Sequence, residues 1–185
     1  AMLLSERKDF HGAIKFLFQP NEEGAGGAKE LISKVVMKNP KVSAVFGLHV
    51  NPRLPFGKIG IKEGPLMAAV DALDIELIGG GGHAAYPHEG KDVITVASEI
   101  IQSIQTIVSR KVDPLEPLVI TIATIHGGTR FNILAEKVNM TGTVRTLSEN
   151  LHRRIPTMIR QIVAGICQAH DVEFKLDYKV LGSVL

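Results

Sequence analysis

The sequence predicts two unlike parts, an α/β fragment over residues 1–66 and an α+β domain of the ferredoxin-like type over residues 67–182. The first part is indicated by a strand, a helix and a second strand that follow one another within residues 12–50. The second part is indicated by a change near residue 64, after which apolar and charged residues begin to alternate. Its elements come in the order β-α-β-β-α-β, which defines the split ferredoxin-like motif.

In the first part, residues 12–18 form an apolar run typical of a buried strand. Residues 24–38 carry apolar side chains at helical spacing, and Asn39-Pro40 ends this helix. Residues 42–50 are β-branched and aromatic, which predicts a second strand, and a short strand follows at 57–61. A strand–helix–strand unit of this kind is expected to be parallel. So few elements cannot cover both faces of a parallel sheet, so this part is expected either to dock on the second part or to lack partners that would cover it.

In the second part, the strands alternate as half-exposed strands of an antiparallel sheet do, and the two helices carry one apolar stripe each. Such a sheet is expected to carry both helices on one face, which leaves the other face open. The predicted strands are 72–78, 118–125, 138–147 and 172–180, and the predicted helices are 92–110 and 148–169.

The composition is that of a soluble globular chain, with 45% hydrophobic and 22% charged residues. A net charge of +2 does not favour nucleic acid or a membrane surface as partner. No stretch reaches the ~20 apolar residues of a spanning helix, and the early charges at the start predict no signal peptide. The single cysteine, Cys167, is assigned to the core and suits a reducing compartment, so a cytoplasmic location is expected.

Three side chains suggest a metal site in the first part. Glu22 and Glu23 follow the first strand directly, and His49 lies near the end of the second. Parallel strands bring their carboxyl ends to one edge of the sheet, where ligands bind. Carboxylate oxygen and imidazole nitrogen are both zinc ligands, and one glutamate can bind a metal while its neighbour acts as a general base. A solvated pair of glutamates and a structural histidine remain the alternatives.

The second part offers two polar constellations. Four glycines precede His83, so the backbone can approach a ligand closely and His83 could donate a hydrogen bond to a developing oxyanion. The alternative is a turn with two exposed histidines; the spacing fits neither a dinucleotide fingerprint nor a P-loop. Asn132 and Arg145 lie at strand ends and together can hold a carboxylate. Their alternatives are a turn cap for Asn132 and a surface salt bridge for Arg145.

Taken together, six short motifs in a fixed order make the chain resemble a known family, the co-catalytic zinc peptidases of the aminoacylase and carboxypeptidase G type. Within that family it is most similar to the amidohydrolases that include hippurate hydrolase, N-acetyl-diaminopimelate deacetylase and the plant hydrolases of indole-acetyl amino acids. The motifs are Phe18-Gln19-Pro20-Asn21-Glu22-Glu23-Gly24, Phe46-Gly47-Leu48-His49-Val50, Gly64-Pro65-Leu66-Met67-Ala68-Ala69, Gly82-His83-Ala84-Ala85-Tyr86-Pro87-His88, Ile125-His126-Gly127-Gly128-Thr129-Arg130-Phe131-Asn132 and Gly142-Thr143-Val144-Arg145-Thr146.

The resemblance implies hydrolysis of the amide bond of N-acyl amino acids by two divalent metal ions, which are zinc, manganese or cobalt. It implies that Glu22 is the general acid/base and that Glu23 and His49 are metal ligands. It also implies that residues 67–182 are a lid domain through which the protein forms a homodimer. The implied substrate-binding residues reach an active site from the lid, often that of the partner subunit; they are His83, Asn132 and Arg145.

Two departures from the family limit the expected activity. The family's His-x-Cys-Gly-His-Asp type motif and a further histidine ligand near the carboxyl terminus are absent from this sequence. The chain is therefore expected to carry half a metal site and to be inactive alone. An alternative function is self-association without catalysis, in which an edge strand of the lid pairs with its copy. Nucleic-acid binding is not favoured, because the strands lack an aromatic pair and a basic stripe.

Overall fold

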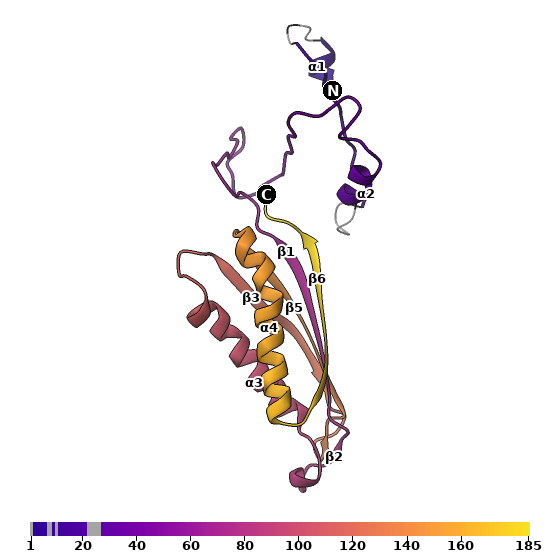
Figure 1. Cartoon of the computed structure of the whole chain (residues 1–185), viewed down its shortest axis with the longest axis vertical. Coiled ribbons are helices and arrows are strands. Elements are labelled where there is room, and N and C mark those ends of the chain that lie inside the picture. The colour runs from indigo at the N-terminus through magenta and orange to yellow at the C-terminus, as the bar shows by residue number, and fades with distance from the viewer. Residues whose placement is uncertain (1, 7–8, 10, 22–26) are drawn as a thin grey trace. The chain divides into compact units, whose positions relative to one another are not determined.

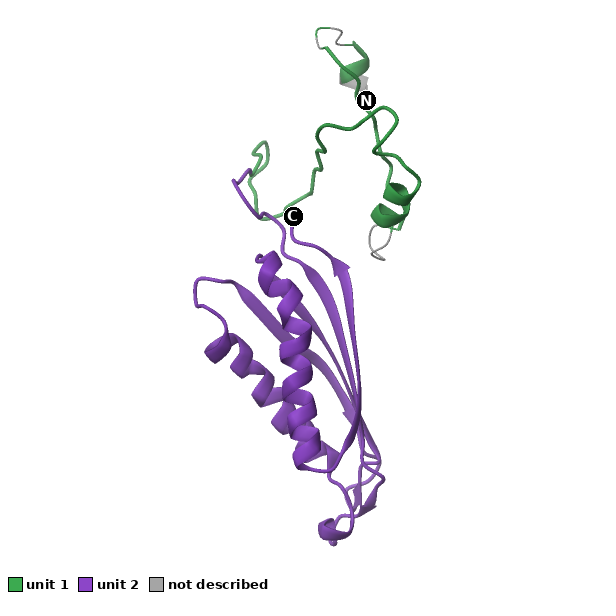
Figure 2. Ribbon diagram, viewed as in Figure 1, with its two compact units in different colours: residues 1–60 green, residues 61–185 purple. Residues whose placement is uncertain are grey.

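The computed structural model describes residues 2–6, 9, 11–21 and 27–185, which divide into two units, residues 1–60 and 61–185 (Figure 2). The second unit is built on a four-stranded antiparallel sheet in the order β3-β5-β1-β6. Its strands are β1 (Val70–Ile78), β3 (Leu118–Gly127), β5 (Lys137–Thr146) and β6 (Glu173–Gly182).

Two helices lie on one face of this sheet (Figure 1). They are α3 (Val93–Thr106), extended by a π-helical turn at Ile107–Lys111, and α4 (Glu149–Ala169). Each begins at a capping side chain: Asp92 accepts from two backbone N–H groups, and Ser148 from one. The predicted antiparallel sheet with both helices on one face is therefore confirmed. Within the described parts of the chain, no helix has the length and apolarity to cross a membrane.

The core of this unit fills the space between sheet and helices. Alternate residues of each strand face the helices, as the period of two requires. Cys167 is in this core as predicted, and burial raises the pKa of its thiol. The largest fully buried side chains include Leu73, Ile75, Leu77, Ile100, Ile104, Ile107, Met140, Leu151, Ile155 and Ile159.

A small projection extends the sheet at one end, which we call the distal end. It contains β2 (Gly82–His83) paired with β4 (Ile133–Leu134), and the 3-10 turn η1 (Pro87–Glu89) (Figure 1). Gly81 and Gly82, which lead into it, have φ angles of +75° and +144°, so this bend favours glycine. The opposite end, where β1 begins and β6 ends, we call the proximal end.

The first unit contains α1 (Met2–Glu6) and α2 (Gly27–Ser33). Its described residues form no strand, so the predicted strands at 12–18, 42–50 and 57–61, and with them the parallel α/β unit, are wrong for this structure. The physical reason is missing cover, because parallel strands need both faces buried. Here Phe18, Phe46 and Leu48 are 86%, 93% and 97% exposed.

Candidate functional site

The predicted metal residues belong to the first unit. Glu22 and Glu23 lie outside the described residues. His49 is exposed, and its Nδ1 lies 2.7 Å from the carbonyl oxygen of Val50, which leaves Nε2 as the atom that could bind a metal. Among the described residues, no three His, Cys, Asp or Glu side chains are grouped so as to hold a metal ion. His49 suits a divalent ion chemically, but the described residues alone do not complete a site. The gathering of Glu22, Glu23 and His49 stays a prediction.

The distal projection brings His83 and Asn132 together. His83 in β2 pairs with Ile133 in β4, and the N–H of Ala84 donates to the carbonyl oxygen of Asn132 over 3.1 Å. Both side chains are exposed. The residue before Asn132 is Phe131, which is fully exposed. Two residues 49 positions apart in the sequence therefore lie side by side in the distal projection of the second unit.

The ring of His83 has a defined tautomer. The backbone N–H of Ala85 donates to its Nδ1 over 3.0 Å, so Nδ1 carries no proton. A neutral ring must then carry its proton on Nε2. The Tyr86 ring packs against it with a centroid distance of 5.4 Å. His83 is thus oriented as a hydrogen-bond donor through Nε2, which is the role an oxyanion requires.

Arg145 lies at the proximal end of β5, half-buried on the open face of the sheet. Its Nη1 donates to the carbonyl oxygen of Val144 over 2.8 Å and to the hydroxyl of Thr143, and lies 3.5 Å from the carbonyl oxygen of Asp71. In the described part of the chain, the guanidinium bonds only through Nη1, to one hydroxyl and two carbonyl oxygens, and pairs with no carboxylate. One edge of the guanidinium is therefore fixed and the other is open for a carboxylate.

The two constellations are far apart. Eight residues of β5 separate Lys137 from Arg145, which corresponds to ~27 Å at ~3.4 Å per residue. The β2–β4 projection lies beyond Lys137 at the distal end (Figure 1). The structure thus unites His83 with Asn132 and separates both of them from Arg145.

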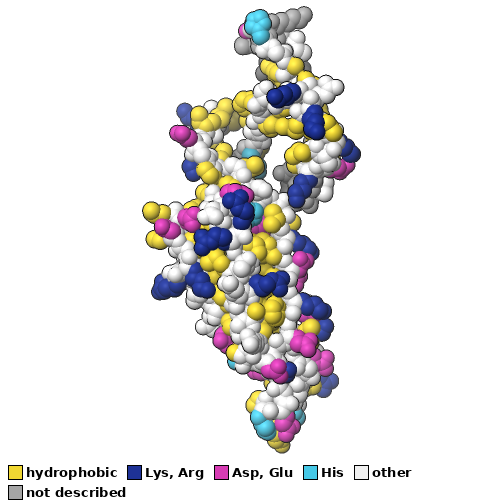
Figure 3. Space-filling model, in the orientation of Figure 1, with side chains coloured by type: hydrophobic (Ala, Val, Ile, Leu, Met, Phe, Trp, Pro, Cys, Tyr) yellow, Lys and Arg dark blue, Asp and Glu magenta, His cyan; other side chains and the backbone are white. Residues whose placement is uncertain are grey.

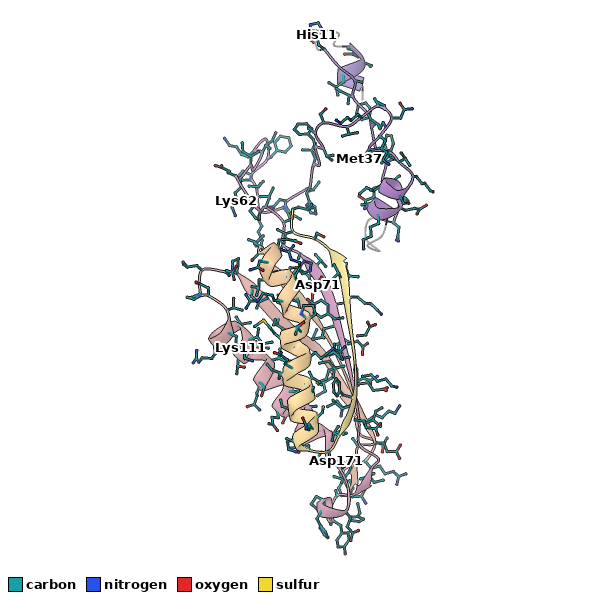
Figure 4. The ribbon with its side chains drawn as sticks, viewed as in Figure 1. His11, Met37, Lys62, Asp71, Lys111 and Asp171 are labelled. Carbon is teal, nitrogen blue, oxygen red and sulfur yellow. The ribbon has the colours of Figure 1, made fainter. Side chains whose placement is uncertain are left out.

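A buried polar network at the proximal end was not predicted. The Asp71 side chain has no exposed surface, and its Oδ2 lies 2.8 Å from Nε2 of His152 (Figure 4 labels Asp71). The hydroxyl of Tyr178 donates to the same oxygen over 2.6 Å. Burial, and then the hydrogen bond to Asp71, raises the pKa of Tyr178. The sequence does contain a signal for this network: Asp71 is the charged member of an alternating series that is otherwise apolar and continues with Leu73.

Charges of both signs are mixed on the surface of this unit where it is seen in Figure 3. On the open face of the sheet, Glu76 pairs with Lys175 over 2.7 Å and with Lys137 over 3.6 Å, and the hydrogen bond from Lys175 lowers the pKa of Glu76. Interspersed charges of this kind are a solvated face.

Comparison with known proteins identifies the relatives of the chain. The family model for peptidase family M20/M25/M40 matches residues 1–168. The chain is 47% identical over 165 residues to an N-acetyldiaminopimelate deacetylase of Bacillus cytotoxicus, with 89% of the chain and 44% of the relative covered. It is 46% identical over 175 residues to an N-acyl-L-amino acid amidohydrolase of Geobacillus stearothermophilus, with 93% and 47% covered.

A solved structure shares the fold. The YXEP protein of Bacillus subtilis, described as a dinuclear metal binding peptidase from the M20 family, superposes with a TM-score of 0.76 at 31% identity. The comparison covers 100% of this chain and 45% of that one. The chain thus spans less than half the length of the relatives it matches.

Proposed function

The chain belongs to peptidase family M20/M25/M40, and on this premise we propose that it is part of a metal-dependent hydrolase that cleaves the amide bond of N-acyl amino acids. The products would be a carboxylic acid and an amino acid. The observation that carries this proposal is the guanidinium of Arg145, which has one edge bonded to the backbone and the other open. Two parallel donors at a fixed position fit the carboxylate that every N-acyl amino acid carries.

The first unit would supply part of the hydrolytic site. Glu23 and His49 are the proposed metal ligands, and Glu22 would accept the proton of the water that attacks the amide carbon. Bound divalent ions would lower the pKa of a water molecule and polarise the carbonyl. Glu23 and His49 alone do not complete a metal site, so we propose that the 185-residue chain is inactive alone.

The distal projection would supply the electrophilic groups. The Nε2–H of His83 is the proposed donor to the oxyanion that forms when water attacks the amide. Its support is the tautomer fixed by the bond from Ala85 to Nδ1. Asn132, held beside it by strand pairing, is the proposed second polar contact to substrate.

Arg145 and His83 cannot contact one substrate from the same lid. An N-acyl amino acid has about the length of a dipeptide, ~7 Å, against the ~27 Å that separates the two ends of the sheet. We therefore propose a homodimer in which Arg145 acts in its own chain's active site. His83 and Asn132 would reach the site of the partner subunit.

The edge strand β3 is the proposed contact between the two copies. Its residues from Leu118 to Ile125 carry no charge, whereas the other edge, β6, carries charges on its exposed face at Lys175, Asp177 and Lys179. Charged edges resist pairing with another strand, and an uncharged edge permits it. Antiparallel pairing of β3 with its copy about a twofold axis would satisfy the free backbone groups of both.

The oligomeric state tests the dimer. Light scattering after size exclusion is expected to give twice the mass of the chain, and Thr121→Lys on β3 is expected to give the monomer mass. Lys175→Thr on β6 is the matched control and should stay dimeric. A strict monomer at high concentration would contradict both the dimer and the alternative function, a self-association module without catalysis.

The hydrolytic proposal is tested by activity. The chain joined to the segments that its relatives carry beyond it should hydrolyse N-acetyl or N-benzoyl amino acids with zinc, manganese or cobalt present. Glu22→Gln should abolish this turnover, because the attacking water then has no base. Ordinary turnover by the 185-residue chain alone, abolished by Glu22→Gln, would contradict the proposed inactivity of this chain.

A further inference from the structure

We propose that Asp71 is a positioning residue for Arg145, acting through its own carbonyl oxygen. The inference rests on the substrate-binding role proposed above for Arg145. The side chain of Asp71 points into the core, where His152 and Tyr178 hold it. Its carbonyl oxygen contacts the Arg145 guanidinium, which lies on the open face. The buried network thus holds the backbone of Asp71 in place from the core side of the sheet, and the Asp71 carbonyl oxygen orients Arg145 on the open face.

The network joins three separate elements. Asp71 belongs to β1, His152 to the first turn of α4 and Tyr178 to β6. Both carboxylate oxygens are used: Oδ1 lies 3.0 Å from Nε2 of His152, and Oδ2 accepts from Tyr178 over 2.6 Å. A fully buried carboxylate is costly, and an apolar residue would continue the strand pattern at lower cost. A role beyond core packing would account for a carboxylate at this position.

The network is itself held from the side of α4. The hydroxyl of Ser148 accepts from the N–H of Leu151 over 3.2 Å and caps the turn that carries His152. The other ring nitrogen of His152, Nδ1, lies 4.0 Å from the Glu149 carboxylate. Among the described residues, no other carboxylate forms an ion pair with the ring within 4.0 Å. His152 is therefore a fixed partner for Asp71.

Strand pairing holds the backbone at Asp71 less regularly than the rest of β1, so the side-chain network can influence its position. The register between β1 and β6 shifts between Val70 and Asp71, so the ladder is irregular there. The carbonyl oxygen of Asp71 accepts from the hydroxyl of Thr143 over 3.0 Å and lies 3.5 Å from Nη1 of Arg145. Since Nη1 is bound on this side, Nε and Nη2 remain for a substrate carboxylate. A shift of the Asp71 backbone would misdirect both donors.

The orientation of Arg145 can be measured in the 185-residue chain itself. The Nε–H signal of Arg145, assigned by its loss in Arg145→Lys, should show a heteronuclear NOE as high as that of the strands. In Asp71→Asn, it should fall toward the value of exposed Arg154. Asp74→Asn changes an exposed aspartate three residues further along β1 and should leave the signal unchanged. An unchanged Arg145 signal in folded Asp71→Asn would overturn the proposal.

Kinetics can distinguish a positioning role of Asp71 from a purely stabilising one. They are measured in the longer protein, which is the chain joined to the segments that its relatives carry beyond it. With N-benzoylglycine, Asp71→Asn should raise KM about tenfold at unchanged kcat. The reason is that the bond between Arg145 and the substrate carboxylate is weakened equally in the bound substrate and in the transition state. With the carboxamide of N-benzoylglycine, which has no carboxylate, the KM should not change. Asp71→Asn combined with Arg145→Gln should be no worse than Arg145→Gln, because one acts through the other.

The outcomes distinguish this inference from the proposed function. If Arg145→Gln leaves the KM for N-benzoylglycine unchanged, the substrate role of Arg145 fails. If Arg145→Gln raises the KM while Asp71→Asn does not, or if the two effects multiply, only the positioning role fails. Should Asp71→Asn not fold, Tyr178→Phe removes one hydrogen bond from the same carboxylate. It should raise the KM for the acid alone by about threefold, and no rise would overturn the proposal.

Discussion

The proximal and distal ends of the second unit present their polar groups in opposite ways. At the proximal end, Arg145 sits in a ten-residue strand and is backed by the buried pair of Asp71 and His152. At the distal end, His83 and Asn132 sit on two-residue strands and a turn, and are exposed. The proposed carboxylate-binding arginine is thus supported by buried groups of the core, while the proposed oxyanion donor lies on an exposed projection. A projection of this kind can enter the site of another copy.

The largest difference between the two ends should be in stability, and two histidines test it. His152→Ala leaves the buried carboxylate of Asp71 with only the hydroxyl of Tyr178 as partner and should lower the free energy of unfolding by about 3–5 kcal/mol. His83→Ala is the matched change at an exposed position and should stay within about 0.5 kcal/mol of wild type. Urea unfolding of the 185-residue chain measures both. Equal losses would mean that the distal end is as integral to the fold as the proximal end.

For kcat, we expect the larger effect at the distal end. In the longer protein, His83→Ala should lower kcat by about 10²–10³-fold, as the loss of one oxyanion donor does. Arg145→Gln should act mainly on KM, because the carboxylate that it binds is present before and during the reaction. Steady-state kinetics with N-acetyl and N-benzoyl amino acids give both values. A KM effect of His83→Ala alone would place it in substrate binding instead.

The smallest predicted difference concerns the two tyrosines of the chain, one at each end. Tyr178→Phe removes a hydrogen bond to a buried carboxylate and should cost about 1.5 kcal/mol, whereas Tyr86→Phe, half-exposed, should cost under about 0.5 kcal/mol. Chemical denaturation at pH 7 measures both.

Tyr178 also predicts a pH dependence. Its pKa is raised in the folded chain, while an unfolded tyrosine ionises near pH ~10. The stabilisation is therefore complete below pH ~10 and falls as the pH rises further, because only the unfolded chain then releases this proton. Burial raises the pKa of Cys167 as well, so the difference between wild type and Tyr178→Phe isolates the tyrosine. Parallel pH profiles for the two proteins would contradict the prediction.

The sequence was sufficient for the second unit and insufficient for the first. The strands and helices of residues 67–182 cover one another, so local pattern and final structure agree. Strands were also predicted at 12–18, an apolar run that alternates poorly, and at 42–50, a β-branched and aromatic run, yet Phe46 and Leu48 remain exposed and no strand forms there. A pattern for a strand buried on both faces specifies that strand only where neighbours exist to cover it.

The roles of the candidate site residues remain predictions from the sequence, and their grouping in space could not be predicted from it. His83 and Asn132 are brought together by strands of two residues, which are too short to carry a periodicity. Arg145 was expected to act with Asn132, but the length of β5 places them at opposite ends. The buried position of Asp71 was not predicted, because the predicted strand begins at residue 72 and a charged residue just before a strand is normally expected to be exposed. The roles proposed for Glu22 and Glu23 remain predictions.

The central claim is that the proximal and distal ends of one lid serve the active sites of different subunits. The most direct test of this claim is to mix variants of the longer protein. Glu22→Gln and His83→Ala homodimers, each inactive, should regain activity after subunit exchange, since one site of the mixed dimer has Glu22 from one subunit and His83 from the other. At a substrate concentration far below the raised KM of Arg145→Gln, a mixture of Glu22→Gln with Arg145→Gln should gain no activity beyond that of its two parents, because both residues act within one chain. No recovery in the first mixture, or equal recovery in both, would contradict the account.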